Sequence, residues 1–428
     1  MIELKEIKIS NLGRRVAYVY NVPSHLKKYF NNSQLFVEYD VDISNVPEHI
    51  LAIPFLANVM PVAWFAHFDV KIMSVDKIFN SSLLELKKEF SKSHPQISEG
   101  TSELIFDHIL ETPSIGTYPK NAMLFSGGLD AYTTFLSHRQ ENPDLITICG
   151  ADMKLSDAKQ WQELVEYNET TDIIANNSKF YIKSNFRDFL TYEVDKLLLN
   201  QGWWGKIQHG MALTTLTAPL SFLNNYKLLY IGSSRSSGMS FSAWGSMPMT
   251  DNLIQWNSTQ VVHDGYNLSR FNKVEFVVDE TANMKLKPPI RACYNEFKTT
   301  LNCNKCEKCA RTIFGLMLKN VDPNLYGFEV NQSIYQNIIR KLENGFATHG
   351  TRLYWEEMIY AYEKNCFFYL QDKESEEEQI HEIIGTYNKV KDKSIGNSSK
   401  KYQWKQEIIH KFPNLFNIYL NLRQKLKE

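Results

Sequence analysis

The sequence predicts an α/β fold built on a doubly wound parallel sheet, and three observations support this prediction. From Asn121 onward, short apolar runs alternate with helical segments, which is the pattern of parallel strands joined by helices. A Gly-Gly turn at residues 126–130 joins the first of these apolar runs to a helix. Farther along the chain, four cysteines crowd into the seventeen residues from Cys293 to Cys309.

The composition is that of a globular protein with more than one domain. The chain has 428 residues, of which 43% are hydrophobic, and this is enough for two or three domains with a sizeable core. Lys and Arg number 47 and Asp and Glu number 48, so the net charge is −1. A charge balance this even argues against a dedicated nucleic-acid-binding protein. The first ten residues lack the apolar core of a signal peptide, so we expect a cytoplasmic protein.

The most apolar segment of the chain is residues 50–66. It is barely long enough to span a membrane, and it contains Pro54, Asn58 and Pro61. We therefore expect a buried helix or a pair of strands here, and no membrane association.

The pattern along the chain divides it into three regions. Residues 1–116 alternate short β-like runs around the apolar segment and predict an N-terminal α+β extension. Residues 117–325 carry the alternating strands and helices, after a linker at 111–120 that is punctuated by prolines and a glycine. Residues 326–428 predict a helical C-terminal region, with a loop at 396–401 and an amphipathic tail from 403 to 428.

Within the middle region, four strands and three helices can be placed. The expected strands are residues 122–125, 145–150, 179–184 and 227–234, and the expected helices are residues 157–167, 186–199 and 210–222. Ligands in such sheets bind beyond the carboxyl ends of the strands. The Gly-Gly turn and the segment Gly232–Ser234 both fall at such ends.

The turn after the first strand is a candidate phosphate site. Its residues are Ser126, Gly127, Gly128, Leu129 and Asp130. Adjacent glycines let the backbone N–H groups and the N-terminus of the following helix converge on an anion. Asp130 adds a carboxylate suited to a Mg²⁺ ion that a nucleotide carries. The turn is not a Walker A loop, because that pattern is absent from the sequence.

The clustered cysteines predict a structural zinc site. Cys303, Cys306 and Cys309 form two overlapping CxxC steps, and Cys293 can complete a tetrahedron. Four thiolates with no open position are typical of structural zinc, while an iron–sulfur cluster is the alternative. Cys149 ends an apolar strand and is expected to belong to the core, and we expect Cys366 to be packed as well.

Together, in this order and separation, the two motifs resemble those of the QueC family of 7-cyano-7-deazaguanine synthases. That family belongs to the PP-loop ATP pyrophosphatases, and its members carry an SGGxDS loop, a four-cysteine zinc motif and an arginine soon after it, which here would be Arg311. The segment 269–275 is similar to the family's segment with a phosphate-facing lysine, here Lys273. The resemblance covers roughly residues 120–320 and implies a PP-loop domain of the HUP-like type. Ala131, which replaces the last serine of the loop, and the segment after the second strand both depart from the family pattern.

The resemblance implies an ATP-dependent ligase that releases AMP and pyrophosphate. ATP would adenylate the carboxylate of 7-carboxy-7-deazaguanine, and an amine would then attack to form an amide. Asp130 and Lys273 are the implied catalytic residues, and the implied cofactors are ATP, Mg²⁺ and Zn²⁺. The nucleotide is expected to contact Ser126, Gly127, Gly128, Leu129, Asp130, Gly232, Ser233 and Lys273.

Candidate substrate residues lie between the two motifs. Asp251 can accept the N–H groups of a guanine-like edge, and Trp244 or Trp256 can stack on the base, although for each tryptophan alone a core anchor is the favoured interpretation. His209 can cap a helix, bind the ligand or pack. The full set of expected substrate residues is Asp251, Trp244, Trp256, His209 and Arg270. His263 and Asp264 form an HD pair without the further residues of a metal site, so we expect loop structure or a substrate contact there.

The two flanking regions point to a larger acceptor. The architecture resembles the expanded QueC-like proteins of bacterial anti-phage operons, the Qat system and type IV CBASS, in which a deazaguanine is joined through an amide to the N-terminus of a partner protein. This implies a partner protein encoded nearby. Three alternatives stay open: a free-standing synthase that uses ammonia and makes the nitrile, a tRNA-thiolating enzyme that relies on Cys149 or Cys366, and an inactive PP-loop scaffold.

Overall fold

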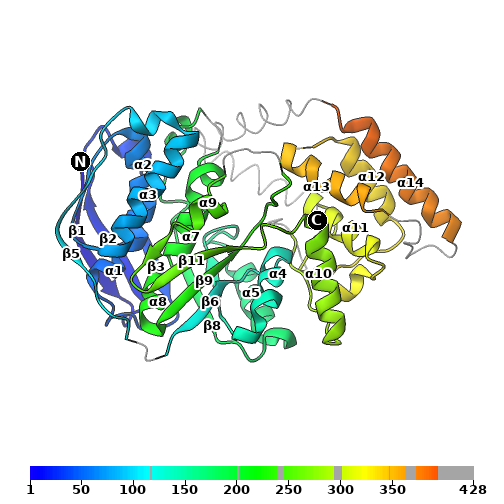
Figure 1. The fold of residues 1–428 in the computed structure, drawn as a ribbon, viewed down its shortest axis with the longest axis horizontal. Coiled ribbons are helices and arrows are strands. Elements are labelled where there is room, and N and C mark those ends of the chain that lie inside the picture. Colours follow the sequence, from blue (N-terminus) through cyan, green and yellow to red (C-terminus); the bar gives the residue numbers. More distant parts are fainter. Residues whose placement is uncertain are drawn as a thin grey trace. The chain divides into compact units, whose positions relative to one another are not determined.

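A computed structural model of the chain contains an eleven-stranded, mostly parallel sheet together with helices (Figure 1). The structure describes residues 1–115, 118–199, 202–239, 244–293, 301–346, 348–362 and 373–393. The predicted packing of Cys366, the loop at 396–401 and the tail at 403–428 lie outside these residues. The α/β class and the large, mostly parallel sheet are confirmed.

The chain forms two compact units. The first unit comprises Met1–Ser126, Thr134–Ser234 and Ser240–Tyr266, and the second comprises Gly127–Thr133, Arg235–Met239 and Asn267–Glu428. All strands of the sheet lie in the first unit. The units do not follow the three regions expected from the sequence, because the N-terminal strands join the same sheet as the strands of the middle region.

The central part of the sheet is parallel. Its order is β11-β9-β6-β7-β8, and the strands are β6 (Lys120–Leu124), β7 (Asp144–Cys149), β8 (Lys179–Ser184), β9 (Tyr226–Gly232) and β11 (Thr259–Asp264). The four strands expected from the sequence are confirmed. Strand β11 and its short antiparallel neighbour β10 (Gln255–Trp256) were not expected.

The remaining strands continue the sheet beyond β8. They are β1 (Ile2–Ser10), β2 (Arg15–Asn21), β3 (Phe36–Tyr39), β4 (Val70–Asp76) and β5 (Leu104–Leu110). Strand β3 pairs antiparallel with β8, with Val37 opposite Ser184. Side chains reinforce this junction, because Ser184 Oγ donates to the Phe36 carbonyl and Phe36 N donates to Asn185 Oδ1. Backbone and side-chain hydrogen bonds therefore fuse the N-terminal strands to the parallel strands.

The apolar segment 50–66 forms helices α1 (Glu48–Leu51) and α2 (Ile53–Ala66). Every residue of α2 except Ala66 is buried, which is typical of a helix that is apolar on all sides and lies in a protein core. Asn58 is satisfied inside the core, since its amide donates to Pro54 O and its Oδ1 accepts from Gln208 Nε2. The buried helix, one of the two structures expected here, is the one observed.

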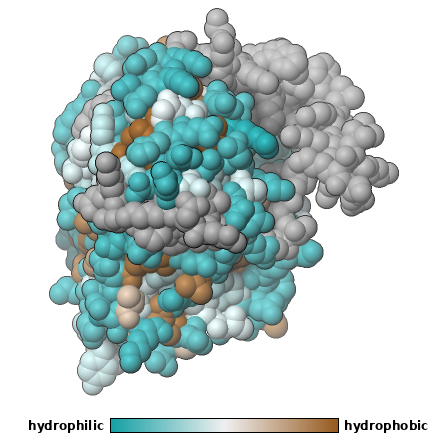
Figure 2. Space-filling view, turned by 90° about the vertical axis from the view of Figure 1, so that its right-hand side faces the viewer, coloured by the Kyte–Doolittle hydropathy of each residue, from teal (hydrophilic) through white to brown (hydrophobic). Residues whose placement is uncertain are grey.

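No helix among the described residues combines the length and the apolar character that crossing a membrane requires. Figure 2 shows a surface on which hydrophilic residues predominate over the described part, with small apolar areas scattered among them.

The other helices of the first unit lie between its strands along the chain. They are α3 (Lys77–Ser93), α4 (Leu129–His138, shared with the second unit), α5 (Ala158–Thr170), α6 (Glu193–Lys196), α7 (His209–Thr215), α8 (Ala218–Asn224) and α9 (Pro248–Asp251). The helix expected at 157–167 is confirmed as α5, and Asp157 caps it by accepting from Gln160 N.

Two expected helices are shorter than the sequence pattern indicated. The helix at 210–222 is broken into α7 and α8, because Pro219 has no N–H to continue the ladder. Only α6 forms within 186–199. There, Leu190 bridges to Phe30 and the Thr191 N–H donates to the Tyr29 carbonyl, so tertiary pairing takes the hydrogen bonds that a helix would use.

The described part of the second unit is helical. It contains α10 (Arg270–Asn283), α11 (Glu307–Leu318), α12 (Ile334–Glu343), α13 (His349–Tyr360) and α14 (Lys373–Val390). Helix α10 packs against α11 and α13, and α12 packs against α11 and α14. The caps are conventional for Ser269 and Thr348, whose hydroxyls accept from the first turns of α10 and α13.

His138 joins two carboxylates at the end of α4. Its Nδ1 lies 2.7 Å from Glu141 Oε1, its Nε2 lies 3.3 Å from Asp264 Oδ1, and its ring stacks on Tyr230 with centroids 3.8 Å apart. Both ring nitrogens face carboxylate oxygens, and this arrangement favours the protonated imidazole, in which both nitrogens donate. The hydrogen bond to Asp264 raises the pKa of His138, against the effect of burial, and the bond to Glu141 raises it further.

We expect the stabilisation from His138 to depend on pH. A raised folded-state pKa gives stability that is complete below the unfolded value of about 6.5 and is lost as pH rises through the folded value. The free energy of unfolding of the natural protein should exceed that of His138→Gln by about 1 kcal/mol more at pH ~5.5 than at pH ~9. Urea unfolding of both proteins measures this difference. A difference that stays constant over this range would contradict the assignment of a protonated His138.

Candidate functional site

The strand–turn–helix expected around residue 128 is present. After β6, the Phe125 N–H donates to the Ile146 carbonyl at 2.8 Å, and residues 126–128 then turn into α4, which begins at Leu129. Gly127 has φ +70°, a left-handed conformation that glycine adopts without steric cost. The turn therefore leads directly into the N-terminus of a ten-residue helix, where backbone N–H groups favour an anion.

Asp130, in the first turn of α4, is held by two cations. Its Oδ1 lies 3.1 Å from Lys273 Nζ and 3.2 Å from Arg270 Nη1, and its Oδ2 accepts from Arg270 Nη2 at 3.3 Å. Burial alone would raise the pKa of Asp130, but the charges of Arg270 and Lys273 outweigh it and hold the pKa below its usual value. The carboxylate is therefore ionised and oriented.

The two cations come from the first turns of α10 and are largely buried. The Arg270 side chain is 11% exposed and the Lys273 side chain is 3% exposed. The Ser269 hydroxyl caps the helix by accepting from Asn272 N, and the Arg270 N–H donates to Glu357 Oε2. The start of α10 is fixed in this way, and both side chains are directed at Asp130.

A third buried cation, Arg311, lies on α11. Its side chain is 6% exposed, Nη1 is 3.6 Å from Glu307 Oε1, and its guanidinium lies 4.3 Å from the centre of the Tyr354 ring. Arg270 lies over the same ring at 5.1 Å, so one tyrosine contacts both guanidiniums. Burial lowers the pKa of Arg311 despite the nearby Glu307 carboxylate.

This group of side chains contains three buried cations. Arg270 and Lys273 pair with Asp130, Arg311 pairs with Glu307, and Glu357 accepts from the Arg270 backbone N–H. Among the described residues, the Nε atoms of Arg270 and Arg311 are buried and have no hydrogen-bond partner. Buried cations without full compensation are costly, and a bound polyanion would relieve that cost. The residues present therefore fit a phosphate chain.

The four clustered cysteines converge, as the sequence predicted. The four Sγ atoms all lie within 4.8 Å of one another. The separations include 3.4 Å for Cys306–Cys309, 3.8 Å for Cys293–Cys306 and 3.9 Å for Cys303–Cys309. Tetrahedral zinc with Zn–S bonds of about 2.3 Å places its sulfurs about 3.8 Å apart. The cluster can hold a metal ion, and its donor set and spacing fit zinc.

The cysteine cluster is tied to the Gly-Gly turn by hydrogen bonds within the second unit. Arg291 lies two residues before Cys293, and its N–H donates to the Gly127 carbonyl at 2.8 Å. The Asn302 side chain fixes this segment, accepting from the N–H groups of Ala292 and Cys293 and donating to the Ile290 carbonyl. A metal bound by Cys293 would therefore brace the backbone that contacts the turn.

Of the expected substrate residues, Arg270 belongs to this group of cations in the second unit, and the other four belong to the first unit. Asp251 ends α9 and is fully buried. Its Oδ2 accepts from Ser246 Oγ at 2.6 Å and lies 2.7 Å from His263 Nδ1. Trp256 is also fully buried, as a core anchor would be. Trp244 is partly exposed and lies near His209, with ring centres 5.9 Å apart. Contacts of these residues with a substrate stay predictions.

Gly232 and Ser233 lie at the carboxyl end of β9, as expected. The Ser233 N–H donates to the Asp264 carbonyl at 2.8 Å, and its hydroxyl lies 2.7 Å from His263 Nε2. No local sequence pattern marks this contact, because His263 lies thirty residues beyond Ser233. A sequence signal is also absent for Tyr354 and Glu357, which sit on a helix beyond the family motifs.

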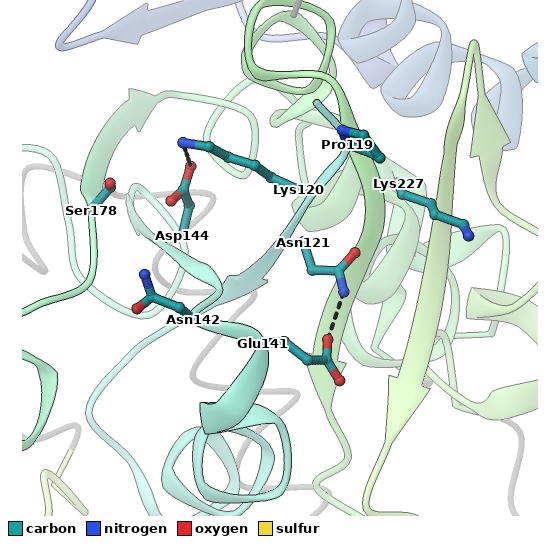
Figure 3. Close-up of a pocket in the computed structure, with 8 residues that line it drawn as sticks. All are labelled: Pro119, Lys120, Asn121, Glu141, Asn142, Asp144, Ser178 and Lys227. Carbon is teal, nitrogen blue, oxygen red and sulfur yellow. Dashed lines mark hydrogen bonds and ion pairs between the residues drawn. The ribbon is translucent and has the colours of Figure 1, made fainter. Parts of the chain in front are cut away.

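A polar hollow of about 360 Å³ lies at the opposite edge of the parallel strands, near their amino ends (Figure 3). Its lining residues are Pro119, Lys120, Asn121, Glu141, Asn142, Asp144, Ser178 and Lys227. Their charges are already paired in part, with Lys120 Nζ 3.9 Å from Asp144 Oδ2 and Asn121 donating to Glu141. Ligands of parallel sheets bind at the other edge, so this hollow is not a candidate for the site.

Comparison of the chain with protein-family models, with curated proteins and with solved structures finds no match.

Proposed function

We propose that this protein is an ATP-dependent ligase that adenylates a carboxylate and passes the acyl group to an amine. The observation that carries the proposal is the group of buried cations formed by Arg270, Lys273 and Arg311, together with the glycine turn at the start of α4. A polyphosphate is the ligand that both features suit.

Each residue has a defined part in the proposed reaction. The N–H groups of residues 126–129 hold phosphate oxygens, and Lys273 with Arg270 neutralises the charge of the leaving pyrophosphate. Asp130 orients both cations and supplies one carboxylate to Mg²⁺. Magnesium sites formed by a single protein carboxylate and the substrate's own phosphates are common. Contacts of Gly232 and Ser233 with the nucleotide rest on the family resemblance alone.

The substrate and the acceptor are inferred from that resemblance. The acid is a 7-carboxy-7-deazaguanine, and the amine is the N-terminus of a partner protein in anti-phage defence. With ammonia as the amine, the same chemistry would release a free nitrile after a second ATP-dependent step. A PP-loop scaffold without activity is the remaining alternative, since Ala131 lacks the hydroxyl that the family loop usually ends with.

Thiolation of tRNA is disfavoured by one observation. That chemistry needs a reactive thiolate, and burial raises the pKa of Cys149 to about 11. A thiol with this pKa is almost wholly protonated near neutral pH and is a poor nucleophile. The other cysteine outside the cluster, Cys366, lies beyond the described residues.

The acceptor is tested by the intact mass of a neighbouring gene product co-expressed with this protein. We expect a mass increase equal to the deazaguanine acid minus one water, and no increase with Lys273→Met. Free nitrile formed without any partner would favour the ammonia-dependent synthase. An unmodified partner in the presence of ATP, the acid and active enzyme would reject the protein acceptor.

A further inference from the structure

A serine, a histidine and an aspartate form a hydrogen-bonded chain in the first unit. Ser233 Oγ lies 2.7 Å from His263 Nε2, and His263 Nδ1 lies 2.7 Å from Asp251 Oδ2. The three side chains are almost completely buried, with residue exposures of 1%, 7% and 0%. Both distances are those of strong hydrogen bonds.

The chemistry of the three groups allows the proton arrangement that activates a serine. A carboxylate oxygen accepts, so His263 donates from Nδ1 to Asp251. In the neutral imidazole Nε2 then accepts, and Ser233 Oγ donates to it. This is the arrangement in which an imidazole takes the hydroxyl proton and an aspartate holds the reactive tautomer.

Two neighbouring strands of the first unit hold Ser233 and His263 in place. Strands β9 and β11 are parallel partners, with His263 opposite Ile231, and Ser233 follows the end of β9 directly. The Ser233 N–H bonds to the Asp264 carbonyl. Strand ends at this edge of a parallel sheet are where catalytic groups of α/β enzymes lie.

The residues around Asp251 accommodate its carboxylate. Ser246 Oγ donates to its Oδ2 at 2.6 Å, and a Cβ on Gly210 would lie only 2.0 Å from its Oδ1. Glycine at position 210 therefore leaves the space that the carboxylate occupies. Oδ1 itself is buried without a hydrogen-bond partner among the described residues. A purely structural bridge would not need a buried carboxylate, because an amide would make the same contacts at a smaller desolvation cost.

We propose that Ser233 is an activated nucleophile that accepts an acyl group from an activated acyl compound, a role other than the nucleotide contact that the family resemblance implies for it. Ser233 Oγ forms a bond to the acyl carbon, the bond from that carbon to the leaving group breaks, and the hydroxyl proton passes to His263 Nε2. His263 then gives the proton to the leaving group. Water or another nucleophile releases the acyl group by the reverse proton movement.

A fluorophosphonate probe tests this proposal on the full-length protein without nucleotide. The serine oxygen displaces fluoride from phosphorus, and the proton leaves with the fluoride. Peptide mapping by mass spectrometry should locate the label on Ser233. The rate of labelling should fall about 100-fold or more in His263→Gln and in Asp251→Asn.

Two comparisons separate this activity from a structural role. Ser221→Ala removes another buried serine hydroxyl, which donates to the carbonyl of Thr217 at the start of α8, and this variant should label at the natural rate. Heat-denatured natural protein should not label, and this comparison needs no substitution. No label on Ser233 in the folded protein would overturn the proposal, as would labelling at Ser233 that is equally fast after denaturation or in His263→Gln.

Discussion

Removal of the metal from the cysteine cluster is expected to unfold the second unit and to abolish pyrophosphate release. Structural zinc sites contribute about 10–16 kcal/mol of apparent binding free energy in small zinc-dependent peptides. Cys309 lies in the first turn of α11 and Cys306 caps that helix, so the metal and the helix depend on each other. The Asn302 and Arg291 hydrogen bonds extend the effect to the Gly127 backbone.

Cys309→Ser and chelation by EDTA both test this expectation. Metal analysis should give one zinc per chain for the natural protein and almost none for the variant. Hydrogen exchange should lose protection in α11 and in the turn at 126–129, while β6–β9 keep theirs. Cys149→Ala, which alters a buried cysteine outside the cluster, is the control and should retain the zinc. Full zinc content in Cys309→Ser, or unchanged exchange after complete metal removal, would contradict the structural role.

Replacement of Lys273 by methionine is expected to reduce kcat/KM for ATP-dependent pyrophosphate release by about 100–1,000-fold, the usual effect of removing one charge-stabilising donor. Methionine keeps the length of the side chain and suits its buried position, so the fold should survive. The Tm of the variant should stay close to that of the natural protein, because the substitution removes a charge at the phosphate site and keeps the packing.

Lys319→Met is the matched control. Lys319 is a lysine of the second unit that pairs with Glu275 and Asp279, and within the described part of the chain no ion pair joins it to Asp130. Loss of the Lys319 charge should leave the rate of pyrophosphate release within about twofold of that of the natural protein, since ion pairs between exposed charges contribute little to stability. Asp130→Asn should reduce kcat/KM for pyrophosphate release nearly as much as Lys273→Met does. Unchanged release in Asp130→Asn would show that the assigned carboxylate does not support Mg²⁺.

Much of the fold was predictable because its signals are local. Apolar runs bounded by turn residues located β6–β9, and the continuous apolar run located the core helix α2. The cysteine spacing predicted the cluster for the same reason, since three of its four members lie on one knuckle. The Gly-Gly turn was equally readable, because a strand, two glycines and a helix follow one another directly.

What the sequence missed depends on contacts between distant residues. The join between β3 and β8 brings residues 37 and 184 together, and no local pattern marks that pairing. The hydrogen-bonded residues Ser233, Asp251 and His263 come from three separate elements, so each appeared in the sequence as an isolated candidate. Leu190 lies in a segment that we expected to be helical, but it forms an isolated β-bridge with Phe30 instead.

The exchange of labelled pyrophosphate into ATP tests the central claim most directly. It reports reversible adenylation of the acid before any amine is needed, and it depends on the buried cations and the glycine turn. We expect exchange that requires 7-carboxy-7-deazaguanine and Mg²⁺, and that is lost in Lys273→Met but kept in Lys319→Met. An absence of exchange in folded, zinc-loaded protein with ATP and the acid, or equal exchange in Lys273→Met, would contradict it.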